Sequence, residues 1–199
     1  MINEYVKFCI ILICFSLVIF NKKWQIDSKS NTYLSCAMFF TVFADFFLVI
    51  LNIYTLGVFV FCFAHVFHIR RYGGNFSKFY LIILILPIIA YFWFYDLLVS
   101  LALLYAQFLI LSCIWAIITA KRQNMPFINA NVILAGMGLF LLCDISVALS
   151  YAATAGFISK SNISHIANVL IWLFYVPSQL LLAFSGYNNL NNLCRRRSL

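Results

Sequence analysis

Seven long apolar runs, separated by short polar connections, constrain this chain more than any other feature. The runs cover about 5–20, 32–51, 54–70, 79–94, 97–119, 130–153 and 163–187. Each approaches or reaches the ~20 residues that a helix needs to cross a bilayer, and none alternates like a barrel strand. Backbone donors must be satisfied within the lipid, which favours helices. The sequence therefore predicts an all-α fold, a polytopic transmembrane helix bundle of about seven spans, with the first and fourth runs the shortest.

Composition places the chain in the same class. Hydrophobic residues make up 65% of the 199 residues, charged residues only 9%, and the mean hydropathy is +1.02. Water-soluble globular domains do not approach these values. The connections are too short to hold a soluble domain, so we expect residues 1–199 to form a single integral membrane domain. Glu4 precedes the first run where a signal peptide would be basic, which indicates a retained span.

Lysine and arginine are distributed asymmetrically between the connections. Eleven of the thirteen lie after the first, third and fifth runs or in the C-terminal tail, whereas Lys7 and Lys160 fall on the other side. This asymmetry predicts an outside N-terminus and a cytoplasmic C-terminus, in a multi-pass protein that we expect in the plasma membrane. It also accounts for the net charge of +8 without a nucleic-acid partner.

Two carboxylates lie inside apolar runs. Asp45 follows an aromatic stretch of the second run, and Asp144 lies in the middle of the sixth, whereas the other three acids lie at or outside run ends. An ionised aspartate at the centre of a bilayer helix costs ~2.5–3.5 kcal/mol on insertion scales. Intramembrane acids are functional candidates for this reason, and we predict that these two meet inside the bundle.

Other polar residues within the runs are candidates to surround the two acids. His65 and His68 lie three residues apart, on one helix face, and Tyr175 and Gln179 lie four apart on another. A structural role, as hydrogen bonds between helices, is the alternative for each of these side chains. The candidates to bind or orient a substrate are His65, Tyr105, Tyr175, Gln179 and Lys7.

No metal or cofactor site is predicted. The chain has three histidines, of which His165 and His68 are expected near opposite ends of the bundle, so a three-histidine zinc site is geometrically poor. The seven cysteines form no C-x-x-C pair and are interpreted as small buried side chains. Motifs for a serine nucleophile, a phosphate loop or haem attachment are absent.

The polar positions resemble the lysoplasmalogenase-like (YhhN) family of multi-span membrane proteins over nearly the whole chain. That family has an acid after an aromatic run, a Gly-Phe-His span, a Gly-x-x-x-Phe-x-x-Ser-Asp span and a final Tyr-x-x-x-Gln span. Departures from the pattern are Ala44 for glycine, Cys143 for serine and His68 for tyrosine. The matching residues are Asp45, then Gly57, Phe61 and His65, then Gly136, Phe140 and Asp144, and last Tyr175 and Gln179.

The resemblance implies hydrolysis of the vinyl-ether bond of a lysoplasmalogen, a single-chain ether phospholipid. The products would be a fatty aldehyde and glycerophospho-ethanolamine or glycerophospho-choline. Such cleavage needs one protonated acid and one charged carboxylate, roles that two neighbouring acids in a low dielectric divide between them. Asp45 and Asp144 would be this catalytic pair, with His65, Tyr175 and Gln179 orienting water and the glycerol oxygens.

Two other classes of function remain open from the residues. A proton-coupled transporter or lipid carrier would also use buried aspartates and a helix bent at a proline such as Pro177. A receptor-like protein of seven spans is less favoured, because its loops and tail would be very short.

Overall fold

The computed structural model describes residues 2–20, 25–75, 83–122, 125–154 and 163–188, except for the side chains of residues 2–4, 7 and 163–165. This part of the chain is all-α, and its only β-type pairing is an isolated bridge between Gln25 and Tyr187. A π-helical segment, η2 (Phe46–Ile50), separates α2 from α3. The α-helices are α1 (Ile2–Phe20), α2 (Ser28–Asp45), α3 (Tyr54–Arg71), α4 (Ile85–Phe94), α5 (Leu97–Arg122), α6 (Phe127–Thr154) and α7 (Ile163–Phe184).

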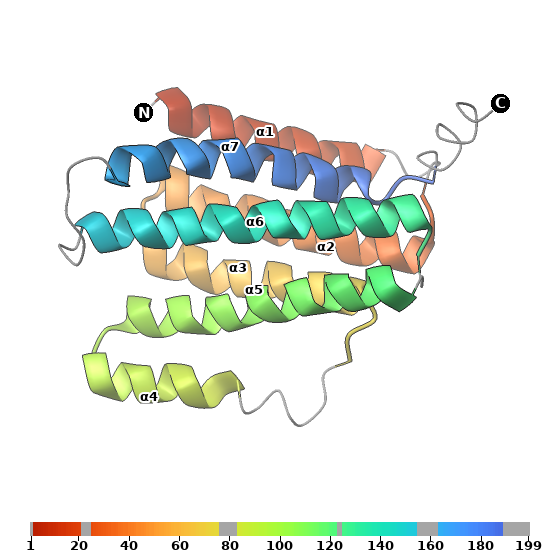
Figure 1. Cartoon of the computed structure of the whole chain (residues 1–199). Helices are drawn as coiled ribbons and strands as arrows, with labels where there is room; N and C mark the ends of the chain where they lie inside the picture. Colours follow the sequence, from red (N-terminus) through yellow and green to blue (C-terminus); the bar gives the residue numbers. More distant parts are fainter. Residues whose placement is uncertain (1, 21–24, 76–82, 123–124, 155–162, 189–199) are drawn as a thin grey trace.

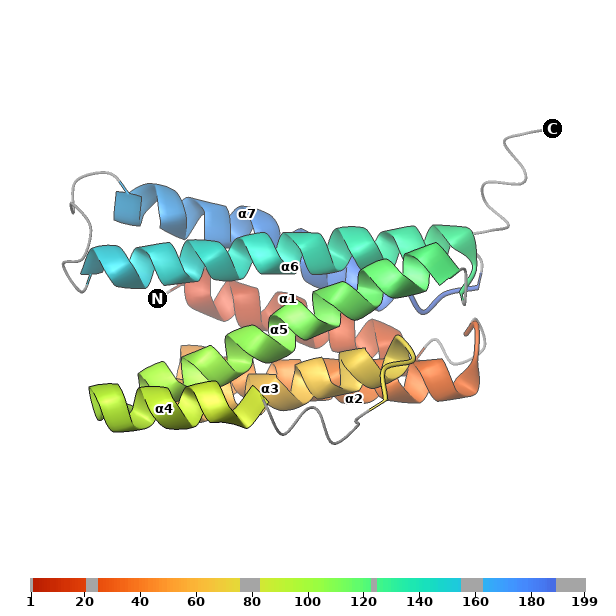
Figure 2. The same ribbon diagram turned by 60° about the horizontal axis from the view of Figure 1, so that its bottom comes forward.

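The helices lie roughly side by side and alternate in direction along the chain, as an up-and-down bundle does (Figure 1). Packing is most extensive between α6 and α7, between α2 and α3, and between α3 and α5. Helix α4 lies at the edge of the bundle, where it packs against α5 (Figure 2). The predicted helical bundle is confirmed, and each apolar run corresponds to one helix.

Within the described residues, four helical segments are long and apolar enough to cross a membrane, namely 28–50, 97–122, 127–154 and 166–184. Helices α1 and α4 contribute shorter apolar segments, Phe8–Phe20 and Ile85–Phe94, in agreement with the two shortest runs. Helix α3 has 18 residues, but these include two histidines and two arginines. The chain is thus a helical membrane protein, and seven full spans stay a prediction.

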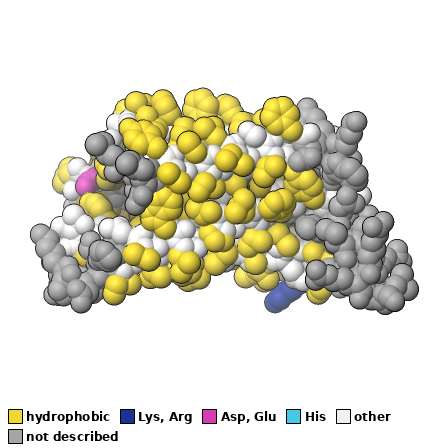
Figure 3. Space-filling view, turned by 90° about the horizontal axis from the view of Figure 1, so that it is seen from above, with side chains coloured by type: hydrophobic (Ala, Val, Ile, Leu, Met, Phe, Trp, Pro, Cys, Tyr) yellow, Lys and Arg dark blue, Asp and Glu magenta, His cyan; other side chains and the backbone are white. Residues whose placement is uncertain are grey.

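The outer surface of the bundle is apolar where lipid would cover it. In the face seen in Figure 3, hydrophobic side chains cover the middle, and charged side chains lie only near the two ends. The described side chains of Lys29, Arg70, Arg71, Lys121 and Arg122 all belong to the ends of helices that meet at one end of the bundle, which we call the basic end. Helix ends with lysine and arginine suit a membrane surface.

Helix α2 extends beyond the apolar run at its start. Asp27 caps it, because one carboxylate oxygen accepts a hydrogen bond of 3.0 Å from the Ser30 backbone N–H. At its other end the chain enters η2 directly after Asp45, and the backbone N–H of Leu51 bonds to the Phe46 carbonyl oxygen over 3.1 Å. π-Helical turns are rare and frequently occur at functional sites. This turn immediately follows one of the two intramembrane acids.

Two glycines each allow close contact between a helix that carries an acid and a neighbouring helix. A Cβ atom at Gly57 would lie 2.4 Å from Cγ of Leu48 and 3.1 Å from the carbonyl oxygen of Ala44. At Gly136 it would lie 3.0 Å from Cγ of Leu182. Small residues permit such approach between membrane helices. Gly57 therefore sets α3 against the turn that carries Asp45, and Gly136 sets α7 against α6.

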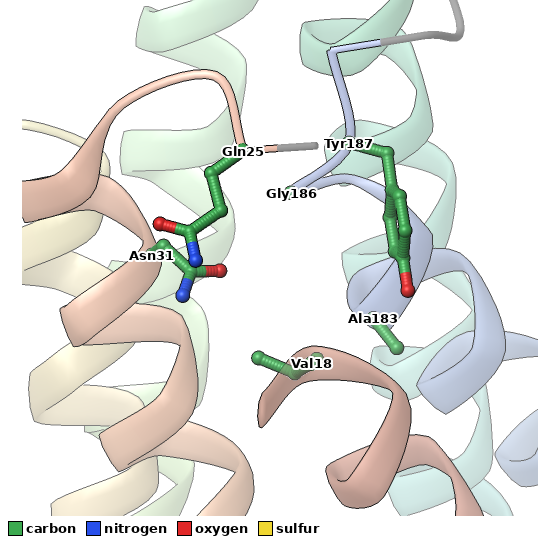
Figure 4. Close-up of a pocket in the computed structure, with 6 residues that line it drawn as sticks. All are labelled: Val18, Gln25, Asn31, Ala183, Gly186 and Tyr187. Carbon is green, nitrogen blue, oxygen red and sulfur yellow. The ribbon is translucent and has the colours of Figure 1, made fainter. Parts of the chain in front are cut away.

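A buried arginine ties the helices together at the basic end. Arg71 is 4% exposed, and its guanidinium donates to Ser185 Oγ over 2.8 Å and to Ser30 Oγ over 3.2 Å. The side-chain amide of Asn129 donates to the Ser185 carbonyl oxygen over 3.0 Å. These bonds join the ends of α2, α3, α6 and α7. A cavity of about 10 Å³ beside them is lined by Gln25, Asn31 and Tyr187 among others (Figure 4), which is room for one water.

Candidate functional site

Asp45 is held by a tyrosine from the last helix. Its side chain is buried at the end of α2, and Oδ2 accepts a short hydrogen bond from the Tyr175 hydroxyl of α7. Tyr175 is also buried, with 7% of its surface exposed. A phenol that donates to a carboxylate stabilises the charged form of the acid. We call this the first Asp–Tyr pair.

Asp144 is held in the same way by a different helix. The hydroxyl of Tyr105, on α5, donates to Asp144 Oδ2 on α6 over 2.6 Å. Both side chains are partly buried between the two helices. This second Asp–Tyr pair repeats the chemistry of the first. Each intramembrane acid thus accepts a hydrogen bond from a tyrosine on another helix.

Both acids lie at a similar depth in the bundle. Asp45 lies fifteen residues beyond Ser30 along α2, and Asp144 fifteen residues beyond Asn129 along α6. Ser30 and Asn129 belong to the same tie at the basic end, and the two helices run in the same direction from it. At 1.5 Å per residue each acid lies ~22 Å from that tie, towards the opposite end of the bundle.

Phe140 connects the surroundings of the two pairs. It lies one helical turn before Asp144 and is 1% exposed. Its ring centroid is 6.0 Å from that of Tyr175 and 5.2 Å from that of His65. The His65 ring lies 5.2 Å from the ring of Tyr105. A continuous set of aromatic contacts thus runs from the first Asp–Tyr pair to the second.

The two histidines of α3 are fully buried and each has one hydrogen-bond partner at Nδ1. For His65 the partner is Ser112 Oγ at 3.0 Å, and for His68 it is the Tyr72 hydroxyl at 3.2 Å. His68 is 0% exposed and lies in the last turn of α3, near Arg71 and the basic end. His65 lies among the residues of the candidate site, whereas His68 continues the polar face of α3 towards Arg71.

Several buried polar atoms in the described part of the chain lack a hydrogen-bond partner. Leaving a buried donor or acceptor unsatisfied costs about 1–3 kcal/mol, so most such groups in natural proteins bond to protein or to ordered water. Gln179 lies one turn from Tyr175 on α7, and both the oxygen and the nitrogen of its side-chain amide lack a hydrogen-bond partner. The others are Nε2 of His65, Nε2 of His68, Nε2 of Gln107 and Nη2 of Arg71. These atoms could bind water or the hydroxyl groups of a substrate.

A polar stripe on α5 went unrecognised in the sequence. Tyr105, Ser112 and Thr119 are spaced by seven residues, which places them on one helix face. Their hydroxyl groups bond to Asp144, to His65 and to the Tyr72 carbonyl oxygen, the last over 2.9 Å. The seven-residue spacing was the signal available, but each residue alone is unremarkable within a hydrophobic helix.

An apolar groove lies between α4 and α5, close to the second pair. Its volume is about 320 Å³, and its walls are mostly aliphatic or aromatic. Two wall residues, Ser100 and Tyr91, carry a hydroxyl group. The Ser100 hydroxyl donates a 2.7 Å hydrogen bond to the Pro87 carbonyl oxygen. Leu101 and Leu104 of the wall adjoin Tyr105 on α5. The lining residues are Leu84, Pro87, Ile88, Tyr91, Phe92, Leu97, Ser100, Leu101 and Leu104.

The structure thus brings most predicted site residues into one region. Asp45, Asp144, Tyr105 and Tyr175 form the two pairs, and His65 contacts the second pair through the Tyr105 ring. Gln179 follows one turn away on α7. The side chain of Lys7, and that of His165, lies outside the described residues. In the described part no cluster of three or more His, Cys, Asp or Glu side chains could hold a metal ion.

The fold and the paired intramembrane acids define a helical membrane protein with a polar centre. The sequence model of the YhhN family matches residues 3–186, which is nearly the whole chain. The chain therefore belongs to the YhhN family, and the resemblance stated from its polar motifs is confirmed. No curated protein and no solved structure matches it.

Proposed function

We propose that this protein is a membrane hydrolase that cleaves the vinyl-ether bond of a lysoplasmalogen. Membership of the YhhN family supports this class of substrate. The observation that carries the proposal is the presence of two Asp–Tyr pairs at a similar depth, connected through Phe140. Two carboxyl groups in one apolar bundle can exist in different protonation states, as general acid–base catalysis requires.

The reaction begins with transfer of a proton from one carboxyl group to the β-carbon of the vinyl ether. The resulting oxocarbenium ion is stabilised by the second, charged carboxylate. Water adds to the α-carbon and loses a proton to a base, which gives a hemiacetal. The hemiacetal hydroxyl then loses its proton as the carbon–oxygen bond to glycerol breaks, the glycerol oxygen takes up a proton in its place, and a fatty aldehyde is released. One water is consumed, and the acid is restored by the proton that the water loses.

The phenol hydroxyls would govern which carboxyl group is charged. Tyr105 and Tyr175 each donate a hydrogen bond to one carboxylate. Weakening either bond would therefore change which of the two aspartates is protonated. His65 and Gln179 supply buried polar atoms that would bind the attacking water and the glycerol oxygens. No metal or cofactor is needed for these steps.

The groove between α4 and α5 would hold the hydrocarbon chain. Its wall is mostly aliphatic or aromatic, and it adjoins Tyr105, so a chain in the groove would bring its ether end towards Asp144. The start of α5, which forms part of this wall, lies at the end of the bundle opposite the basic end (Figure 1). A hydrocarbon chain that runs along the groove from Tyr105 would therefore extend towards that end.

The direct test is aldehyde release from lysoplasmalogen by purified protein in detergent. Asp45→Asn and Asp144→Asn should each lower the rate at least ~100-fold, the lower range for loss of a general acid or base. Asp27→Asn is the matched control, since asparagine also caps helices, and it should retain activity. Full activity in both buried variants, with folding intact, would refute the proposal.

A proton-coupled transporter or lipid carrier is the second candidate, because buried acids also serve as proton sites in transporters. The two functions differ in whether the lipid is changed chemically. Protein in liposomes should release aldehyde if it is a hydrolase. Lipid flux that depends on Asp45 and Asp144, with every lipid recovered intact, would instead support transport.

A further inference from the structure

The hydrogen bonds of Ser112 determine which nitrogen of His65 carries the proton. The Ser112 hydroxyl has one hydrogen and two neighbours, the Leu109 carbonyl oxygen at 2.8 Å and Nδ1 of His65 at 3.0 Å. A carbonyl oxygen can only accept, whereas Nδ1 either donates or accepts, depending on the tautomer. Counting bonds for the two tautomers decides between them.

If Nδ1 carries the hydrogen, both bonds form at once. Nδ1–H donates to Ser112 Oγ, and Oγ–H donates to the Leu109 carbonyl oxygen. If Nε2 carries the hydrogen instead, the hydroxyl must choose between its two acceptors, and one bond is lost. The Nε2–H group would then be a buried donor, because Nε2 has no partner in the described structure. Unsatisfied buried donors are rarer than unsatisfied acceptors.

We infer that Ser112 holds neutral His65 as the Nδ1–H tautomer and leaves Nε2 as a bare acceptor inside the bundle. Nε2 lies on the side of the ring away from Ser112. The imidazole itself is fixed between the Phe140 ring, stacked at 27°, and the Tyr105 ring. Such a buried lone pair needs a hydrogen-bond donor, which a water molecule would supply.

This inference deepens the proposed function and, in its catalytic part, rests on it. In the hydrolysis, Nε2 of His65 accepts a hydrogen bond from the water that adds to the oxocarbenium ion. Ser112 does not touch the substrate and is a positioning residue. His68 offers the contrast: the Tyr72 hydroxyl either donates to its Nδ1 or accepts from it, so the same counting does not select a tautomer.

Nitrogen-15 NMR of histidine-labelled protein tests the tautomer without any substrate. The chain has three histidines, and signals are assigned with His68→Asn and His165→Asn variants. We expect long-range proton–nitrogen correlations to show hydrogen on Nδ1 of His65, and Ser112→Ala to move the signal towards the Nε2–H form. Hydrogen on Nε2 in the wild-type protein would overturn the inference, whatever the protein is found to catalyse.

Kinetics tests the catalytic part. Ser112→Ala should lower kcat roughly 10-fold, the size expected for the loss of one hydrogen bond, with KM nearly unchanged. Ser112→Thr, which keeps the hydroxyl, should restore most of kcat. Ser146→Ala is the matched control, because Ser146 is buried and bonds only to the Leu142 carbonyl oxygen of its own helix. Equal loss in Ser112→Ala and Ser146→Ala would contradict a positioning role, and absence of aldehyde from the wild type would reject the proposed function alone.

Discussion

Tyr175 donates a hydrogen bond to Asp45, although the two residues lie 130 positions apart and belong to helices at opposite ends of the chain. Tyr105 and Asp144 repeat this relationship between α5 and α6. Each intramembrane acid is thus hydrogen-bonded to a phenol hydroxyl from another helix.

Tyr105→Phe and Tyr175→Phe should each slow aldehyde release by roughly 10- to 100-fold. The reason is the loss of a hydrogen bond to a charged group, which contributes about 1.5–3 kcal/mol. Phenylalanine keeps the ring contacts with Phe140 and His65, so the fold should persist. Rates are compared with Tyr151→Phe, an exposed tyrosine on α6. Wild-type rates in both variants would show that the carboxylates do not need their phenols.

The glycines between helices provide a test of packing with an internal control. Gly57→Ala should destabilise the protein by about 1–3 kcal/mol, the usual cost of overpacking, because its Cβ would lie 2.4 Å from Leu48. Gly138→Ala should be neutral or stabilising, since no atom lies within 4 Å of the new Cβ and alanine favours helices. The measurement is the unfolding free energy in mild detergent. Equal stability of the two variants would contradict the close approach at Gly57.

The tie at the basic end should depend on one serine. Ser185→Ala removes one of the two side-chain acceptors of the buried Arg71 guanidinium and should cost about 1–3 kcal/mol of stability. Ser178→Ala is the matched control, because Ser178 is equally buried and bonds only within its helix, to the Tyr175 carbonyl oxygen. Thermal unfolding of both variants measures the difference. An equal loss of stability in Ser178→Ala would contradict a specific contribution of the Ser185–Arg71 hydrogen bond.

A bulky side chain in the groove should change the preference for chain length. Leu101→Trp fills the space between α4 and α5, so hydrolysis of long-chain lysoplasmalogen should fall more than hydrolysis of short-chain lipid. Ile110→Trp, exposed on the same helix, should affect neither. The ratio of kcat/KM for the two chain lengths is the readout. A ratio unchanged by Leu101→Trp would place the hydrocarbon chain elsewhere.

The predicted orientation requires the C-terminus to lie in the cytoplasm. A green fluorescent protein fused there should fluoresce, since it folds poorly after export, and a fused alkaline phosphatase should be inactive. The expected result follows from the basic connections, which are retained on the cytoplasmic side. An active phosphatase fusion would contradict the predicted orientation.

Much of the fold follows from hydrophobic patterning alone. The apolar runs predict the helices because lipid leaves the backbone no other way to satisfy its donors, and the limits of α5 and α6 differ from the runs by only a few residues. The differences arise where polar residues extend a helix past its apolar part. Ser28–Asn31 join α2 because Asp27 caps it, a local effect that hydropathy does not record.

The intramembrane acids were evident from sequence, because an aspartate in an apolar run is costly and needs a reason. The partners of these acids were not evident, since tyrosine is common in this chain, with 11 copies, and any of several could face inward. Only tertiary packing selected Tyr175 for Asp45 and Tyr105 for Asp144. The sequence by itself determined which groups are buried in the membrane, because transfer from water depends on residue type. The structure decided which of them touch, because hydrogen bonds between helices depend on how the helices pack.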